Sequence, residues 1–266
     1  MKKAFYGLLL SLCLPLQAAE ISLIIDDVGY NPQQGVKALE MPGKIVYGIL
    51  PGTPHATMLA EMAHAQGKEI LVHIPMESEH HKKLGPDALT QNMSEEQYKQ
   101  TVESALETVP YAVGFNNHMG SLLTQLQQPM QWLMDVIEEK QLLFLDSRTT
   151  TGTVAESVAK HQGVPAFRRD VFLDNERDEA AITKQFQQLV RRAKRRGYAT
   201  GIGHPYPETM AVINKQLPLL KEQGVELVFL SDRLQKTKSE TTEQERNTAW
   251  QESSYHSPKV VKNLKP

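Results

Sequence analysis

Cysteine is almost absent from this chain, since Cys13 is the only one. Cys13 lies in an N-terminal segment that we expect to be removed, so the mature protein would contain none. Disulfide bonds and cysteine catalysis are therefore excluded in the mature form. A hydrophobic core must stabilise the fold, and any metal ligands must be His, Asp or Glu side chains.

Several other signatures are also missing. The sequence has neither a Gly-rich phosphate loop nor a Gly-x-Ser-x-Gly nucleophile motif. Its net charge of −2 gives no sign of the strongly basic face that nucleic-acid binding requires, so we expect no nucleic-acid partner. One basic cluster spans Arg191 to Arg196. We interpret it as the solvated end of a helix, and contact with an anionic polymer or a lipid headgroup is the alternative.

The N-terminus has the pattern of a secretory signal peptide. A positive start, Met1 to Lys3, precedes an apolar run from Ala4 to Leu16, and the small residues Ala18 and Ala19 follow. The run is shorter than the roughly 20 residues that span a bilayer, which disfavours an uncleaved anchor. We predict that residues 1–19 are a signal peptide and that the protein is periplasmic or secreted. No later segment is long and apolar enough to cross a membrane, so the mature form should not span one.

Strand-like and helix-like segments alternate along most of the chain. Amphipathic stretches predict helices at 56–66, 94–108, 129–140, 180–196 and 209–223. Apolar runs that end in polar residues predict strands at 21–25, 45–50, 70–73, 112–115, 142–145, 164–167, 200–203 and 227–230. This alternation indicates an α/β fold with a parallel sheet.

Eight strands in this length fit a distorted or incomplete (β/α) barrel, with a doubly wound open sheet as the alternative. We assign residues 20–234 to one domain. Residues 235–266 are rich in Lys, Glu, Thr, Ser and Gln, and we predict that this polar tail is disordered.

The first predicted strand ends in two adjacent carboxylates, Asp26 and Asp27. Burying such groups is costly unless they have partners or a function. Neighbours in an extended segment point in opposite directions, so only one can face a given partner squarely. This suits a division in which one carboxylate binds a metal and the other accepts a proton. A turn with a helix cap is the alternative interpretation.

Histidines follow three other strands. His73 and His118 are each, taken alone, more often hydrogen-bonded core residues than ligands. Together with Asp27 they form an Asp-His-His set, and three such ligands with an open position for water make up a catalytic zinc site. We therefore predict a divalent metal, with Zn²⁺ as the first choice. His204 is a candidate general acid, because the pKa of imidazole lies near neutrality, and a structural role is the alternative.

Further polar residues at strand ends are candidates for binding substrate or supporting the ligands. Asp170 could orient His204 or a ligand His through its second ring nitrogen. Arg148 or Arg169 could stabilise a carboxylate or an oxyanion. Arg–Asp pairs that close the barrel mouth are the alternative for each. The complete set of these candidates is Asn117, Asp146, Arg148, Arg169 and Asp170.

Five segments together resemble the divergent polysaccharide deacetylase family, which is distantly related to the NodB-type deacetylases. They are Ile24–Tyr30 (IIDDVGY), His73–Glu77 (HIPME), Gly114–Ser121 (GFNNHMGS), Leu145–Ser147 (LDS) and Gly203–Pro205 (GHP). The resemblance covers about residues 20–234. It implies a NodB-like barrel and a location in the cell envelope.

The resemblance also implies roles for individual residues. By position, Asp26 would be the catalytic base, Asp27 a metal ligand and His204 the late catalytic histidine. In the NodB-type enzymes a second histidine lies a few residues after the one matched by His118. Here Leu122 and its neighbours offer none, and we choose His73 as the remaining ligand.

The expected function is metal-dependent hydrolysis of an acyl group from a cell-envelope carbohydrate. The acyl group would be held by an amide or an ester bond. The alternative is a non-catalytic envelope protein that binds a glycan or a protein partner and retains a degenerate deacetylase site. The missing second histidine motivates this alternative, whereas the presence of Asp26, Asp27 and His204 argues against it.

Overall fold

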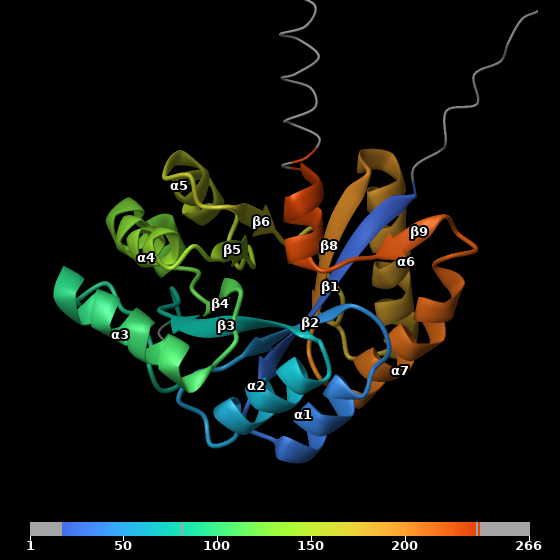
Figure 1. Ribbon diagram of the computed structural model, residues 1–266, viewed down its shortest axis with the longest axis horizontal. Helices are drawn as coiled ribbons and strands as arrows, with labels where there is room; N and C mark the ends of the chain where they lie inside the picture. Colours follow the sequence, from blue (N-terminus) through green and yellow to red (C-terminus); the bar gives the residue numbers. More distant parts are fainter. Residues whose placement is uncertain (1–17, 81, 238, 240–266) are drawn as a thin grey trace, which may run out of the picture.

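The computed structural model describes residues 18–80, 82–237 and 239 (Figure 1). The strands are β1 Ala19–Val28, β2 Ile45–Ile49, β3 Glu69–Met76, β4 Gly114–Met119, β5 Leu143–Asp146, β6 Ala166–Arg168, β7 Val171–Phe172, β8 Tyr198–Gly203 and β9 Val225–Leu227. The helices are α1 Pro32–Leu39, α2 Ala56–Ala65, α3 Glu95–Thr108, α4 Gln127–Glu139, α5 Ala155–His161, α6 Glu179–Arg196 and α7 Pro207–Gln216, with 3-10 turns η1 Leu123–Gln125 and η2 Leu217–Leu219.

The strands form one parallel sheet in the order β6-β5-β4-β3-β2-β1-β8-β7. This is the cyclic order of an eight-stranded barrel with one opening, because β6 and β7 do not pair within the described chain. Only two residues, Arg169 and Asp170, connect these two strands. The short β9 pairs with the start of β1. The helices surround the sheet (Figure 1), so the prediction of an incomplete (β/α) barrel is confirmed.

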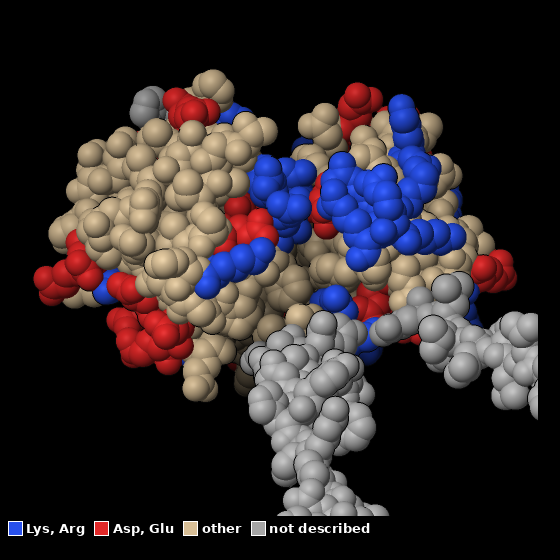
Figure 2. Space-filling view, turned by 90° about the horizontal axis from the view of Figure 1, so that it is seen from above, with Lys and Arg blue, Asp and Glu red and all other residues tan. Residues whose placement is uncertain are grey.

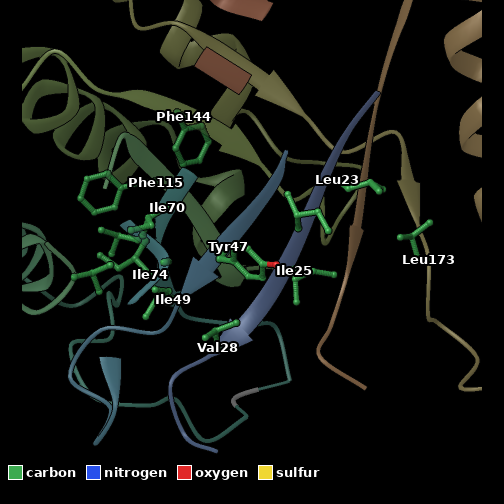
Figure 3. Close-up of a cluster of buried hydrophobic side chains, with 14 of the residues drawn as sticks. Leu23, Ile25, Val28, Tyr47, Ile49, Ile70, Ile74, Phe115, Phe144 and Leu173 are labelled. Atoms are coloured by element: carbon green, nitrogen blue, oxygen red, sulfur yellow. The ribbon is translucent and has the colours of Figure 1, made fainter. Parts of the chain in front are cut away.

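Side-chain alternation divides the strand residues between two clusters. Residues such as Ile25, Tyr47 and Phe115 belong to the large core shared with the helices (Figure 3). The alternate positions, including Ile24 and Ile202, form a smaller apolar cluster inside the barrel. Because strand side chains repeat every two residues, the next inward positions toward the carboxyl ends are Asp26, Ser147, His73 and His204. The barrel interior is therefore apolar in the middle and polar at the end where ligands bind.

A helical segment at residues 230–237 closes the opposite end of the barrel. Its first side chain, Leu230, is fully buried in the inner cluster. Glu69 accepts hydrogen bonds from the backbone N–H groups of Leu230 (3.0 Å) and Ser231 (3.2 Å) and so caps the helix. Glu20 pairs with Arg233 at 3.3 Å. The helix extends past the predicted domain boundary at 234, and residues 240–266 of the predicted tail lie outside the described residues.

Several elements differ from those predicted. Helices α1 and α5 and the two-residue β7 were not expected, and the last strand is β9 at 225–227 rather than 227–230. An available signal for α1 is Asn31, whose side chain caps the helix, followed by Pro32 at its first turn. Most of the predicted signal peptide, residues 1–17, lies outside the described residues. No helix in the described part of the chain has the length and hydropathy that a membrane crossing requires.

Candidate metal and catalytic site

Both carboxylates of the Asp pair reach the carboxyl end of the barrel. Asp26 continues the inward-facing series of β1 and is 2% exposed. The register between β1 and β2 shifts between Ile25 and Val28, and Asp27 has a φ of 60°. This left-handed conformation turns Asp27 toward the same site. Our expectation that the two side chains would point in opposite directions is wrong here, because the strand is not extended at Asp27.

Three donor atoms converge at this point. Asp27 Oδ1 lies 2.8 Å from His118 Nδ1 and 3.2 Å from His73 Nε2, and the two nitrogens are 3.2 Å apart. Asp27 Oδ1 is buried but accepts no hydrogen bond of ordinary geometry from the described residues. Ligand atoms about 2.0–2.2 Å from a common metal would lie roughly 2.9–3.6 Å apart. The three predicted ligand residues, which lie on β1, β3 and β4, are thus arranged in a way that suits a metal ion.

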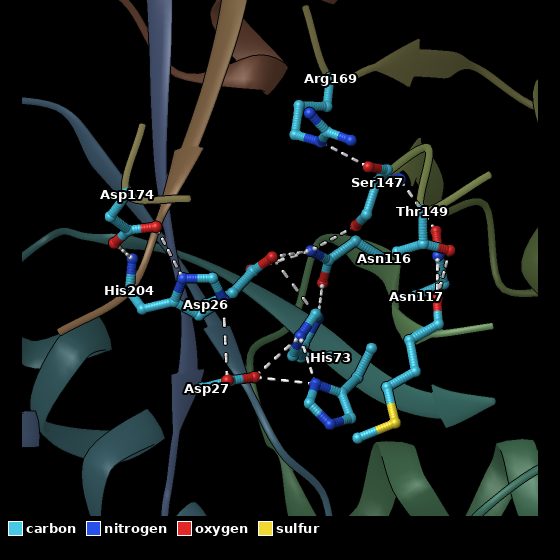
Figure 4. A network of polar contacts seen from close by, with 12 residues as sticks. Asp26, Asp27, His73, Asn116, Asn117, Ser147, Thr149, Arg169, Asp174 and His204 are labelled. Carbon is cyan, nitrogen blue, oxygen red and sulfur yellow. Dashed lines mark hydrogen bonds and ion pairs between the residues drawn. The ribbon is translucent and has the colours of Figure 1, made fainter. Parts of the chain in front are cut away.

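Asn116 links the metal-ligand candidates to Asp26. Its side-chain oxygen lies 2.9 Å from His73 Nδ1, so this nitrogen carries the proton and Nε2 presents its lone pair to the site (Figure 4). Its side-chain nitrogen donates to both oxygens of Asp26 at 2.9 Å. Sequence reasoning missed Asn116. Its spacing of two residues from His118 on β4 would have placed it on the same inward face.

Gly48 of β2 makes room for this network. A Cβ atom at this position would lie 2.1 Å from Asp26 Oδ1 and 3.3 Å from Asn116 Oδ1. Any larger residue would displace the carboxylate from its partners. The glycine therefore supports the site by leaving space, although it contributes no functional group.

His204 is oriented by Asp174. Asp174 accepts from His204 Nδ1 at 2.9 Å and from the His204 backbone N–H at 2.6 Å. Thr209 also donates to Asp174, at 2.8 Å. His204 Nε2 is left facing the site, 3.6 Å from Asp27 Oδ2. A histidine held in this way can keep or release a proton at Nε2.

The prediction that Asp170 orients His204 is wrong. Asp170 instead accepts from Arg196 of α6 at 3.0 Å and from the backbone N–H of Thr200 at 3.1 Å. These contacts hold the connection between β6 and β7 against α6 and β8. Asp174 was missed because it follows β7, a strand of two residues that leaves almost no pattern in the sequence.

Asn117 and Asp146 brace the loops that frame the site. Asn117 accepts from the backbone N–H of Ser147 and donates to the carbonyl of Met119, both at 2.8 Å. Asp146 is fully buried and accepts from the backbone N–H of Arg148 at 2.8 Å and from Thr153 at 2.9 Å. Asn117 lines a cavity at the carboxyl ends of the strands, whereas Asp146 does not line it and instead holds the neighbouring loop.

The two candidate arginines, Arg148 and Arg169, differ in the contacts that their side chains make. Arg169 lines the cavity and donates from Nε to the Ser147 carbonyl (2.5 Å) and from Nη2 to the Arg148 carbonyl (2.6 Å). Its guanidinium also lies 5.0 Å from the centre of the Phe172 ring. The Arg148 guanidinium forms no hydrogen bond or ion pair with a described residue. Among the described residues neither Arg148 nor Arg169 forms an Arg–Asp pair, whereas Asp170 does pair with an arginine, Arg196, as the alternative interpretation expected.

Burial and neighbouring charges shift the titration of these groups. Burial raises the pKa of Asp26, and the nearby imidazoles of His73 and His204 only partly offset this. Burial also raises the pKa of Asp27, but contacts with His118 and His73 outweigh it and leave this pKa well below its usual value. For His204, burial lowers the pKa, but the hydrogen bond to Asp174 and the charge of Asp27 dominate and raise it. The two adjacent carboxylates are thus shifted in opposite directions.

A cavity of about 790 Å³ lies at the carboxyl ends of the strands, beside these groups. The residues from the predicted site that border it are Asp26, His73, Asn117, His118, Arg169, Asp170 and His204. The cavity is large enough for a small ligand or part of a polymer. The Asp26 carboxylate, the Asp174-held His204 and two of the three possible metal ligands, His73 and His118, therefore line one accessible space.

Comparison with known proteins shows which family this chain belongs to. The model of the divergent polysaccharide deacetylase family matches residues 23–234. The chain belongs to the divergent polysaccharide deacetylase family. It is 37% identical over 242 residues to the uncharacterized protein YibQ of Escherichia coli strain K12, which covers 91% of this chain and 76% of YibQ. Asp27, His73 and His118 all lie within the region that the family model matches.

Solved structures show the same fold. An uncharacterized protein of Agrobacterium tumefaciens C58 superposes with a TM-score of 0.79 at 24% identity, over 82% of this chain and 90% of that protein. A mutant of a CE4 family pseudoenzyme, with restored enzymatic activity, superposes with a TM-score of 0.50 at 14% identity, over 82% and 68% of the two chains. This chain thus has a fold similar to that of a CE4 family pseudoenzyme.

Proposed function

We propose that this protein hydrolyses an acyl group, held by an amide or ester bond, from a carbohydrate of the cell envelope. The observation that supports this most strongly is the convergence of Asp27 Oδ1, His73 Nε2 and His118 Nδ1 at the edge of a cavity that Asp26 and His204 also line. Family membership supports a carbohydrate substrate. The signal-peptide pattern at residues 1–19 supports a periplasmic or secreted location.

Each residue has a distinct part in this proposal. Asp27, His73 and His118 would hold a divalent metal, with zinc as the first choice for a set of two imidazoles and one carboxylate. When bound, such a metal lowers the pKa of water and polarises an acyl oxygen. Asp26, fixed by Asn116, accepts the proton of the attacking water.

The final proton transfer falls to His204. Asp174 holds its Nδ1–H, so that Nε2 faces the site and can donate a proton to the departing amine or alkoxide. Asn117 and Arg169 border the same cavity, and in this proposal they contact the substrate. In this scheme the acid and the base approach the acyl group from separate strands, β8 and β1.

The test combines metal content with turnover. Protein purified without chelator or affinity metal should contain about one zinc or similar ion per chain, and His118→Ala should lose it. Asp26→Asn should keep the metal but release acetate from an N-acetylated chito-oligosaccharide or an O-acetylated xylan about 10²–10⁴-fold more slowly. His161→Ala, at an exposed position of α5 outside the cavity, is the matched control and should change neither quantity.

A binding protein with a degenerate site is the second candidate. It is favoured by one observation: Leu122 and its neighbours provide no second histidine near His118. If neither wild type nor variant takes up metal when zinc is offered, and no acylated glycan is cleaved, this second candidate replaces the first. Full activity in both Asp26→Asn and His118→Ala would also contradict the proposed mechanism.

A further inference from the structure

A second cavity, rich in arginine, lies at the opening of the barrel between β6 and β7. Its volume is about 340 Å³. We call it the seam cleft, and its lining residues are Arg148, Thr150, Thr151, Arg168, Arg169, Asp170, Arg192 and Arg196. On the face seen in Figure 2, Lys and Arg gather on both sides of a groove. Five arginines thus line one cleft beside a break in the sheet.

The positive charge of the seam cleft is only partly compensated. Asp170 accepts from Arg196 at 3.0 Å, and its carbonyl accepts from Arg192 at 2.8 Å. Arg168 lies 3.6 Å from Glu156. Asp146 also interacts electrostatically with Arg148 and Arg169, so three carboxylates lie near the five arginines. Like charges concentrated in a concave site raise the local potential and attract anions, and the guanidinium fork matches carboxylate and phosphate oxygens.

Arg148 has an unusual backbone conformation. Its φ of 48° is left-handed, a conformation that is costly for a long side chain. Asp146 fixes it by accepting from its N–H, and Arg169 by donating to its carbonyl. Its guanidinium makes no hydrogen bond or ion pair within the described chain. A strained backbone thus presents at the cleft a guanidinium that no described carboxylate contacts directly, although the charge of Asp146 lies within electrostatic range.

The seam cleft adjoins the catalytic cavity. Arg169 and Asp170 line both spaces, so one polymer chain could contact both. We propose that the seam cleft binds a carboxylate or phosphate group of the glycan whose acylated sugar occupies the catalytic cavity. This inference rests on the proposed function and names its substrate class: an acidic glycan. The basic helix end that we interpreted as solvated then contributes Arg192 and Arg196 to a binding site.

The test measures binding separately from turnover. The probes are a galacturonate hexamer, poly(glycerol phosphate), neutral N-acetylchitohexaose, inorganic phosphate and anionic phospholipid vesicles. Dissociation constants are measured by calorimetry for the first four probes and by sedimentation for the vesicles, at low and at physiological salt. At low salt at least one acidic polymer should bind tenfold or more tightly than the neutral hexamer, and added salt should reduce this preference.

Two double variants that remove the same number of charges decide whether the seam cleft is responsible for the binding of acidic polymers. Arg148→Asn/Arg168→Gln removes two cleft charges, and asparagine tolerates the left-handed backbone. Arg191→Gln/Arg195→Gln removes two charges from exposed positions of α6 outside the cleft. The first should weaken acidic-polymer binding about tenfold or more, and the second less than threefold.

Three results would overturn the inference: equal binding of acidic and neutral chains, equal losses in both double variants, or binding of phosphate or vesicles alone. The outcome is separable from that of the proposed function. Binding at the seam cleft without hydrolysis would contradict the deacylase proposal but keep the cleft. Hydrolysis of a neutral glycan at the same rate by wild type and by the cleft variant would support the deacylase proposal but contradict the cleft inference.

Discussion

At the scale of single residues, the site depends on a missing side chain, that of Gly48 on β2, as well as on the residues that surround it. Asp26 is almost fully buried and owes its position to two hydrogen bonds from Asn116. A buried carboxylate that loses such partners destabilises the fold and changes its own pKa. The empty space over Gly48 is what allows this pair to form.

Gly48→Ala should therefore damage the site specifically. The added methyl group would lie 2.1 Å from Asp26 Oδ1, so the carboxylate must move. We expect acyl hydrolysis to fall at least tenfold and the free energy of unfolding to fall by about 1–3 kcal/mol, the usual cost of overpacking. Gly67→Ala is the control, because a Cβ there meets no atom within 4 Å, although its φ of 66° makes the change mildly destabilising. Equal activity losses in the two variants, measured with urea unfolding alongside, would contradict this role of Gly48.

The sequence predicts much of the site at this scale, but not its supporting residues. Asp27, His73 and His118 could be grouped because parallel strands end at one edge of a sheet. The spacing of Asn116 from His118 could have placed Asn116 on the inward face. Its role as the partner of His73 is recognised only from the register of β3 and β4, which places the two residues side by side. The turn of Asp27 toward the site also depends on a local shift in pairing that no composition pattern reveals.

At the scale of secondary-structure elements, the strands were predicted better than the connections. Long apolar runs such as those of β1 and β3 mark fully buried parallel strands. Short elements show too little hydrophobic periodicity to be recognised, and for this reason α5 and β7 were not predicted. The helix at 230–237 shows a further limit, because its position depends on the distant carboxylate of Glu69. Local propensity does not report such a partner.

The C-terminal helix should contribute strongly to stability through Leu230. This side chain is fully buried in the inner cluster, at the end of the barrel opposite the site. Leu230→Ala should reduce the free energy of unfolding by about 2–5 kcal/mol, because it leaves a cavity among side chains that cannot all relax. Leu219→Ala is the matched control, since Leu219 is 42% exposed and should cost less than about 1 kcal/mol. Urea unfolding of both variants measures the difference, and a Leu230→Ala cost no larger than that of the control would show that the helix does not seal the barrel.

At the scale of the whole molecule, the candidate ligands join parts of the barrel that are far apart in sequence. Asp27, His73 and His118 come from β1, β3 and β4, and the unfolded chain does not hold them together. A metal that binds the folded barrel more tightly than the unfolded chain must stabilise folding by mass action. Metal binding can therefore be detected by stability alone, without knowledge of the substrate.

We expect zinc at about 100 times its dissociation constant to add about 2.7 kcal/mol to the free energy of unfolding. For a domain of this size that is a rise in Tm of about 5–10 °C. His118→Ala should lose most of the rise, because two donor atoms remain, whereas His161→Ala should keep it. Asp26→Asn should also keep it, since Asp26 supports His73 through Asn116 without contributing a ligand atom. The measurement is thermal unfolding with and without zinc, with magnesium as the control ion. An equal zinc-dependent rise in Tm in wild type and His118→Ala would show that the metal binds elsewhere in the chain. Asp27, His73 and His118 would then not be its ligands.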